Sequence, residues 1–178
     1  PRFGNAVVKD YLGVQRDNYK FLHDQAVRRM NNGETAPEIA RVACALYDQH
    51  DDLLKTFINS TRDGVALRGY QYRLSDSESL SLLARSNIPR LLTDLPTVLQ
   101  PTTAHSSYVL EEGYRSSFTV PMRHRGQFIG FVFFDSRDDS TFTPHVVREL
   151  MLHANLITMA VANELVAISS VVSRPTSS

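Results

Sequence analysis

The sequence predicts an α+β domain in which helices cover both faces of an antiparallel β-sheet. Three observations lead to this fold class. The segment Phe128 to Phe134 is apolar at nearly every position, which is typical of a central strand covered on both sides. The segment 53–74 is rich in β-branched and aromatic residues around a turn, and the segment 143–168 carries apolar residues at helical spacing. Helices and strands mixed in this order indicate a sheet packed between helices.

Length, charge and cysteine content exclude several classes of protein. The chain has 178 residues, 42% of them hydrophobic, enough for one core. Nineteen basic and nineteen acidic residues cancel, so the overall charge favours neither nucleic acid nor an anionic membrane as a partner. No apolar run reaches the ~20 residues that a membrane-spanning helix needs. The single cysteine, Cys44, cannot form an intrachain disulfide, so we predict a cytoplasmic protein.

Two helices are predicted at the start of the chain. Apolar residues at helical spacing indicate a helix over 14–30, which Asn31-Asn32-Gly33 ends. Thr35 and Glu38 have the spacing of a capping box, which predicts a second helix. Its apolar stripe is Ile39, Val42, Ala43 and Leu46. Residues 1–34 are expected to form an N-terminal helical segment that precedes the main domain.

The middle of the chain predicts a hairpin, a helix, a strand and a loop. The hairpin pairs Leu53–Ser60 with Val65–Leu74 around the turn Arg62-Asp63-Gly64. Ser75 and Glu78 have capping-box spacing and predict a short helix that ends before Pro89. A third strand is expected over Arg90–Leu95. The segment Pro96–Gly113 has no sustained period, which favours a loop carrying one short helix.

The last third of the chain predicts two strands and a long helix. Tyr114–Met122 and Gln127–Asp135 are strands joined by a turn at Arg125-Gly126. Thr143 is the expected N-cap of the final helix, and Pro144 its first residue. Apolar residues continue this helix for about seven turns, to Ile168.

This last third resembles the signature ending of GAF domains. The resemblance rests on Gly113–Met122, on Phe128–Ser136 and on Phe142-Thr143-Pro144, in that order and spacing. It implies a sheet of five or six strands, with the first and last helices on one face and a helix- and loop-roofed pocket on the other. It places the sensory domain at 35–168, with 169–178 starting a linker to an output domain. The runs 59–64 and 72–76 are also similar to GAF domains that precede enzymes of cyclic di-GMP signalling.

GAF domains bind cyclic nucleotides, bilins, haem or metabolites in this pocket, or leave it empty, and the residues here bear on that choice. The Asn-Lys dipeptide of the cyclic-nucleotide motif is missing. Cys44 lies on an apolar stripe, away from the position that a bilin thioether needs, and a second cysteine for sulfoxide reduction is also missing. His105 is the only histidine we would nominate as a haem ligand, although a loop histidine is the simpler interpretation. His145 and His153 are eight residues apart, too far to chelate a metal together, so no metal site is predicted. The cofactor stays unknown.

The candidate ligand-binding residues come from the predicted hairpin, the loop and the last two strands. Alternation along one strand places Arg115, Ser117 and Thr119 on the pocket side. Gly130 would let the final helix approach the sheet, which turns neighbouring apolar residues towards the pocket. The candidates are Tyr70, Tyr72, His105, Tyr108, Arg115, Ser117, Thr119, Ile129, Phe131 and Phe133. Two alternatives stay open: Arg115 pairs with Glu111 or Glu112, and the aromatic residues only fill the core.

The final helix predicts the partner. Its apolar residues run past the point where one domain could cover them, through Val166, Ile168, Val171 and Val172. Pairing with the same helix of a second copy, together with the N-terminal helix, would bury them in a homodimer. The sequence thus predicts a regulatory sensory domain without catalytic activity, which binds an unknown small molecule and controls an attached output domain. The alternatives are a ligand-free dimerisation module, a small enzyme using Ser and His residues, and a final helix that packs only on its own sheet.

Overall fold

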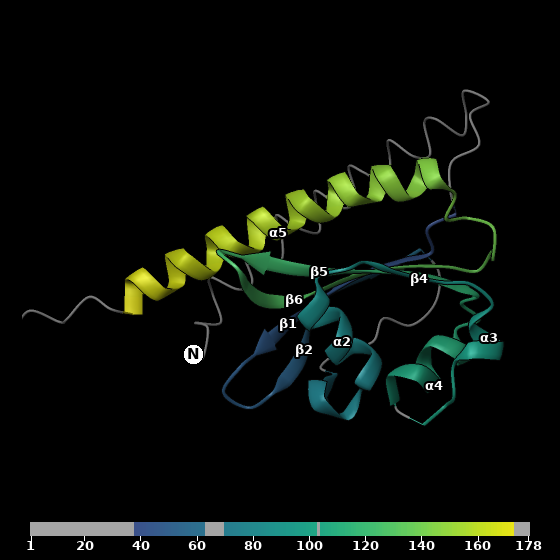
Figure 1. Cartoon of the computed structure of the whole chain (residues 1–178), viewed down its shortest axis with the longest axis horizontal. Helices are drawn as coiled ribbons and strands as arrows, with labels where there is room; N and C mark the ends of the chain where they lie inside the picture. The colour runs from purple at the N-terminus through teal and green to yellow at the C-terminus, as the bar shows by residue number, and fades with distance from the viewer. Residues whose placement is uncertain (1–37, 63–69, 103, 173–178) are drawn as a thin grey trace, which may run out of the picture.

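The computed structural model describes residues 38–62, 70–102 and 104–172, and within them shows one sheet with helices on both faces (Figure 1). The sheet has six strands in the order β3-β2-β1-β6-β5-β4, and every neighbouring pair is antiparallel. The strands are β1 (Arg41–Asp48), β2 (Leu53–Thr61), β3 (Gln71–Arg73), β4 (Arg90–Leu92), β5 (Ser116–His124) and β6 (Gln127–Ser136). The predicted α+β class, with an antiparallel sheet of five or six strands, is confirmed.

Strand β6 lies in the interior of the sheet, between β1 and β5. Phe131 and Phe133 belong to the apolar cluster on one side of the sheet, and Val132 and Phe134 to the cluster on the other. Both faces of the strand are therefore buried, which explains its continuous apolar sequence. The sequence-based prediction for this segment is confirmed.

Strand β1 corrects the prediction of a second helix after Thr35. Residues 41–48 pair with β2 on one side and with β6 on the other. A strand with both faces buried carries a continuous apolar run, here Val42 to Leu46, and such a run also places apolar residues at helical spacing. Periodicity over so short a segment does not distinguish a helix from a strand. The pairing of residues 41–48 with β2 and β6 makes the segment a strand.

Helix α5 (Pro144–Val172) lies across one face of the sheet, which we call the α5 face (Figure 1). Thr143 caps the helix as predicted, because its Oγ1 accepts a hydrogen bond from the Val146 amide at 3.3 Å. Ala154, Ile157 and Val161 pack into the core cluster of this face. None of the described helices is both long and apolar enough to cross a membrane. The predicted helix over 14–30 lies outside the described residues.

The opposite face, which we call the α4 face, carries three short helices (Figure 1). They are α2 (Glu78–Ser86), α3 (Leu95–Val98) and α4 (Ala104–Glu111). The N-cap of α2 is Ser77, whose side chain accepts from the Leu80 amide, so the cap lies two residues beyond the predicted Ser75. The predicted loop 96–113 contains α4 and most of α3. Both helices pack on the sheet through Leu95 and Val109.

A β-bulge interrupts β6 near its start. Met122 of β5 pairs with Gly130 and Arg123 pairs with Phe128, which leaves Ile129 as an extra residue. Gly130 has φ +149°, and a Cβ atom there would lie 2.0 Å from the carbonyl oxygen of Ala45. Glycine is therefore required by the close approach of the β1 backbone. Our prediction that it admits the final helix is wrong.

Candidate functional site

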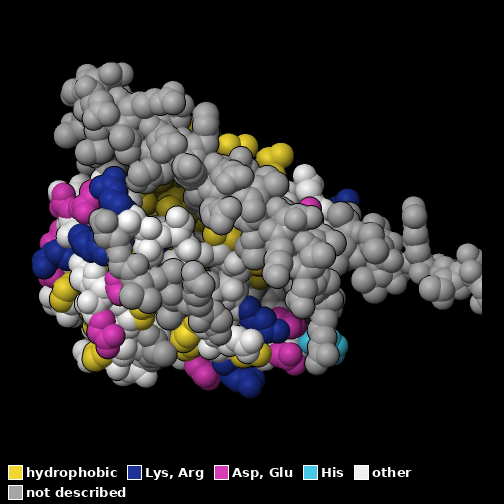
Figure 2. Space-filling view, turned by 180° about the vertical axis from the view of Figure 1, so that it is seen from behind, with side chains coloured by type: hydrophobic (Ala, Val, Ile, Leu, Met, Phe, Trp, Pro, Cys, Tyr) yellow, Lys and Arg dark blue, Asp and Glu magenta, His cyan; other side chains and the backbone are white. Residues whose placement is uncertain are grey.

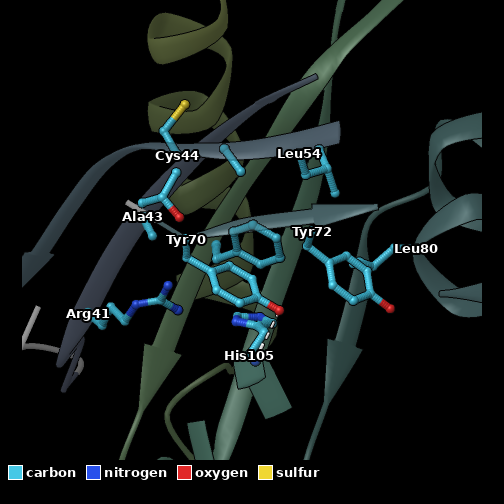
Figure 3. Close-up of a pocket in the computed structure, with 11 residues that line it drawn as sticks. Arg41, Ala43, Cys44, Leu54, Tyr70, Tyr72, Leu80 and His105 are labelled. Carbon is cyan, nitrogen blue, oxygen red and sulfur yellow. Dashed lines mark hydrogen bonds between the residues drawn. The ribbon is translucent and has the colours of Figure 1, made fainter. Parts of the chain in front are cut away.

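A small cavity lies on the α4 face, between the floor formed by β1 and β6 and the first turn of α4. Its volume is about 30 Å³. The side chains around it come from the sheet, from α2, from α4 and from the residue before β3 (Figure 3). The lining residues are Arg41, Ala43, Cys44, Ala45, Leu54, Thr56, Tyr70, Tyr72, Leu80, His105 and Phe133. A space of this size holds one or two water molecules.

A buried ion pair forms one end of the site. Arg41 Nη1 donates to Asp135 Oδ2 at 2.5 Å, and each side chain is 2% exposed. Arg41 Nε also donates to Asn59 Oδ1 at 3.1 Å, and its guanidinium lies 5.4 Å from the ring centre of Tyr108. These contacts satisfy the buried guanidinium by charge, hydrogen bonds and a cation–π interaction. The pair contributes no net charge to the cavity.

His105 stands over the floor from the first turn of α4. Its ring centre lies 5.6 Å from that of Phe133 and 5.9 Å from that of Tyr70, and its backbone amide donates to the Tyr70 hydroxyl at 3.1 Å (Figure 3). Burial lowers the pKa of His105 to about 4, and the nearby Arg41 adds to this. The imidazole is therefore neutral at pH 7. Among the described residues, none forms a hydrogen bond with its ring nitrogens. A neutral imidazole carries one donor and one acceptor.

Haem or a bilin does not fit the site as it stands. The space under His105 is about 30 Å³, far below the size of a tetrapyrrole. Cys44 touches the cavity, but its thiol points away from the other labelled side chains, and its Sγ lies 4.0 Å from Met122 Sδ in the core of the α5 face (Figure 3). Burial raises the pKa of Cys44 to about 12, so the thiol stays protonated and unreactive.

The structure brings four of the predicted ligand-binding residues together at the cavity: Tyr70, Tyr72, His105 and Phe133. Phe131 lies in the same apolar cluster as Phe133. Ser117 and Thr119 are buried and point to the α4 face, because they pair with Asp135 and Phe133. Tyr108 packs against Arg41 and Tyr114 next to the cavity.

Two predicted residues lie elsewhere. Arg115 is exposed at the edge of the domain, where its guanidinium lies 2.8 Å from Asp139 and 3.9 Å from Asp94. It thus forms an ion pair as the alternative interpretation held, but with partners other than Glu111 and Glu112. Ile129 packs with the cluster of the α5 face, because the bulge reverses the alternation of β6 at this point.

Sequence reasoning missed several residues of the site, above all the charged ones. Arg41 and Asp135 are 94 positions apart and meet only because β1 pairs with β6. Arg41 directly precedes the apolar run of β1, and Asp135 lies near the end of β6. A charged residue next to each apolar strand was the sequence feature that could have indicated this ion pair. Leu54, Thr56 and Leu80 were also missed.

The visible surface shows no concentration of one charge. Figure 2 shows Lys and Arg side chains intermingled with Asp and Glu over the described part of that face, and hydrophobic side chains at its upper edge. A stripe of basic residues, which a phosphate backbone would require, is not seen there. Within the described ranges, no group of three His, Cys, Asp or Glu side chains could hold a metal ion.

A comparison with protein-family models decides the family. The model described as the GAF domain matches residues 34–161. The chain belongs to the GAF domain family. GAF domains are sensory, small-molecule-binding domains of signalling proteins, and they are generally regulatory rather than catalytic. They commonly occur in multidomain proteins.

Solved structures with the same fold support this assignment. A phycocyanobilin-bound GAF domain from a cyanobacterial phytochrome has a TM-score of 0.58 at 15% identity, covering 91% of this chain and 95% of that chain. The GAF domain of a two-component sensor histidine kinase from Bacillus halodurans has a TM-score of 0.61 at 13% identity, covering 81% and 96%. A type II free methionine-R-sulfoxide reductase from Thermoplasma acidophilum has a TM-score of 0.59 at 18% identity, covering 88% and 95%. A comparison with curated proteins found no match.

Proposed function

We propose that this GAF domain is a regulatory sensor that binds a small molecule beneath α4 and transmits its presence through α5 to an output domain in the same polypeptide. The observation that carries the proposal is the composition of the cavity wall. His105 and Tyr70 line it from outside the sheet, whereas Ala43 and Phe133 line it from the sheet itself. A ligand that fills this space contacts both layers at once.

Because the cavity is small, ligand binding would change the positions of the side chains around it. A ligand larger than one or two water molecules must displace His105, Tyr70 or Tyr72 from their present positions. The Tyr70 hydroxyl accepts a hydrogen bond from the backbone amide of His105, so displacing the Tyr70 side chain removes a contact that holds the start of α4. Binding therefore favours a second arrangement of α4, in proportion to the difference in affinity for the two arrangements.

The outer side of α5 supplies the proposed dimer contact. Leu152, Leu156 and Met159 are 66%, 62% and 63% exposed and follow one another at intervals of four and three residues. At 100° per residue they lie opposite Ala154 and Val161, which face the sheet. Spacing of this kind is that of a coiled-coil seam. A second copy would bury the stripe in a parallel pair of helices that leads towards the proposed linker at 169–178.

The proposal also extends to the rest of the protein. We propose that residues 1–34 form a helical segment that joins the dimer contact, that 35–168 are the sensory unit, and that the protein is cytoplasmic. A domain that makes or degrades cyclic di-GMP is the proposed output. The buried Cys44 is the only cysteine of the sequence, which argues against sulfoxide reduction through a pair of thiols.

A cavity-filling variant tests the binding step. Ala43→Val places two extra methyl groups in the floor of the cavity, while Val42→Ile adds one methyl group on the opposite face of the same strand. Native mass spectrometry of the freshly purified full-length protein should detect a bound small molecule in the wild type and in Val42→Ile, but not in Ala43→Val. A wild-type protein without any bound compound, after expression in its native host, would favour the alternative of a ligand-free dimerisation module.

A further inference from the structure

A row of side chains links the cavity to the sheet edge formed by β4. Arg90 of β4 is paired with Thr119 of β5, which is paired with Phe133 of β6. Directly paired residues point to the same face of a sheet, so these three side chains lie on the α4 face. Adjacent strands are about 4.8 Å apart, so the row runs over about 10 Å from the cavity floor at Phe133 to Arg90.

Two buried polar atoms along this row have no hydrogen-bond partner among the described residues. Thr119 is 1% exposed, and its Oγ1 atom has no partner among the described residues. The same holds for Arg90 Nε, while Arg90 Nη1 donates to Ser79 Oγ on α2. The neighbour of Ser79 on that helix, Leu80, lines the cavity. Buried polar atoms without a partner are costly, and an acceptor at this point would satisfy both.

Arg90 also brings an uncompensated positive charge to the site. Asp135 balances Arg41, whereas no carboxylate in the described part of the chain pairs with Arg90. Burial lowers the pKa of the Arg90 guanidinium below its ordinary value. Its field reaches the imidazole of His105, where it acts against protonation together with Arg41. Arg90 does not line the cavity itself, but it lies on the same face of the sheet, two strands away from Phe133.

We propose that the cavity receives a small organic carboxylate, whose anionic group binds Arg90 and Thr119 and whose apolar body lies on Phe133 beneath His105. One unpaired guanidinium matches one carboxylate in charge and in planar geometry. The body of the ligand meets Phe133, Leu80 and Tyr72, which make that end of the cavity apolar and aromatic. This assignment rests on the proposed function and adds to it the chemical class of the ligand.

Benzoate and benzamide serve as probes, because they share a shape and differ in charge. Both are titrated into the full chain at pH 7 and followed by two-dimensional NMR, in the wild type and in Arg90→Gln. Arg148→Gln is the matched control, since Arg148 is exposed on α5, on the far side of the sheet. Arg90→Lys keeps the positive charge but lacks the planar guanidinium group, which can donate two parallel hydrogen bonds to a carboxylate. We expect benzoate to bind the wild type at least about tenfold more tightly than benzamide, as a charge-assisted hydrogen bond predicts.

The variants decide the assignment. Arg90→Gln should remove the preference for benzoate, Arg90→Lys should keep part of it, and Arg148→Gln should keep all of it. Equal binding of the two probes to the wild type overturns the carboxylate assignment but leaves the proposed sensor function standing, because the cavity has still taken a small molecule. A preference that survives in Arg90→Gln overturns it as well. Binding of neither probe at 10 mM, a concentration about tenfold above a millimolar Kd, contradicts the carboxylate site. The native mass spectrum then decides the sensor function separately.

Discussion

Arg41 and Asp135 form an ion pair across β1 and β6 in which each side chain is 2% exposed. The pair closes one end of the cavity and joins the two central strands of the sheet. Because both groups are removed from water, each depends on the other for compensation of its charge. The pair therefore links the stability of the fold to the shape of the site.

Asp135→Ala should destabilise the domain strongly. The change leaves the guanidinium of Arg41 buried without a counter-charge, which typically costs about 3–5 kcal/mol. Urea denaturation gives the free energy of unfolding. The double variant Arg41→Met with Asp135→Ala should recover most of the loss, because no unpaired charge remains. A double variant as unstable as the single one would show that the pair does not act through charge compensation.

Gly130→Ala should be among the most damaging single-atom changes in the sheet. The added Cβ would lie 2.0 Å from the carbonyl oxygen of Ala45, in a backbone conformation that side chains rarely adopt. We expect a loss of about 3 kcal/mol or more in the free energy of unfolding. Gly126→Ala is the control, because it also has positive φ but no atom within 4 Å of the added Cβ, and should cost about 1 kcal/mol. Similar losses in both variants would contradict the close approach of β1.

Leu156→Lys should dissociate the proposed dimer. The exposed Leu156 lies in the middle of the stripe on α5, and a charge at this position would be buried between the two helices. Sedimentation velocity at tens of micromolar should show a dimer for the wild type and a monomer for the variant. Leu82→Lys, at a similarly exposed leucine on α2, should stay dimeric. A wild-type protein that is monomeric at this concentration would contradict the proposed homodimer.

Acidification should destabilise the domain through His105. The folded-state pKa of about 4 is lower than the ordinary value of 6.5, so the unfolded chain binds the proton more readily. The contribution of His105 is fully present above pH 6.5 and is lost as the pH falls towards 4. Arg41 and Arg90 oppose protonation in the folded state, whereas Asp135 favours it.

His105→Leu removes this titration, so the free energy of unfolding should fall less between pH 7 and pH 5 than in the wild type. His145→Gln is the control, because that histidine is exposed at the start of α5. The same fall with pH in His105→Leu as in the wild type would show that the imidazole is not held neutral by its surroundings.

The sequence predicts the C-terminal half of the fold well, because its signals are local. The turn Arg125-Gly126, the cap Thr143 and the continuous apolar run of β6 each specify one element without help from distant residues. Strand β1 was predicted as a helix because its apolar run fits both periods, and only its pairing with β2 and β6 distinguishes them.

The site was predicted in part, for a related reason. Aromatic residues such as Tyr70 and Phe133 could be nominated from their strands and from the family resemblance. The charged residues Arg41, Arg90 and Asp135 could not, since their roles arise from cross-strand register between distant segments. The bulge at Ile129 reversed the face of one residue and left no mark in the sequence other than the adjacent Gly130.

The most direct test of the central claim is a crystal structure of the full-length protein as purified from its native host. We predict electron density for a small molecule between α4 and β6, in contact with Phe133 and with the imidazole of His105. Density for one or two waters only, with Tyr70 and His105 in the positions described above, would contradict the claim that this cavity is a ligand site.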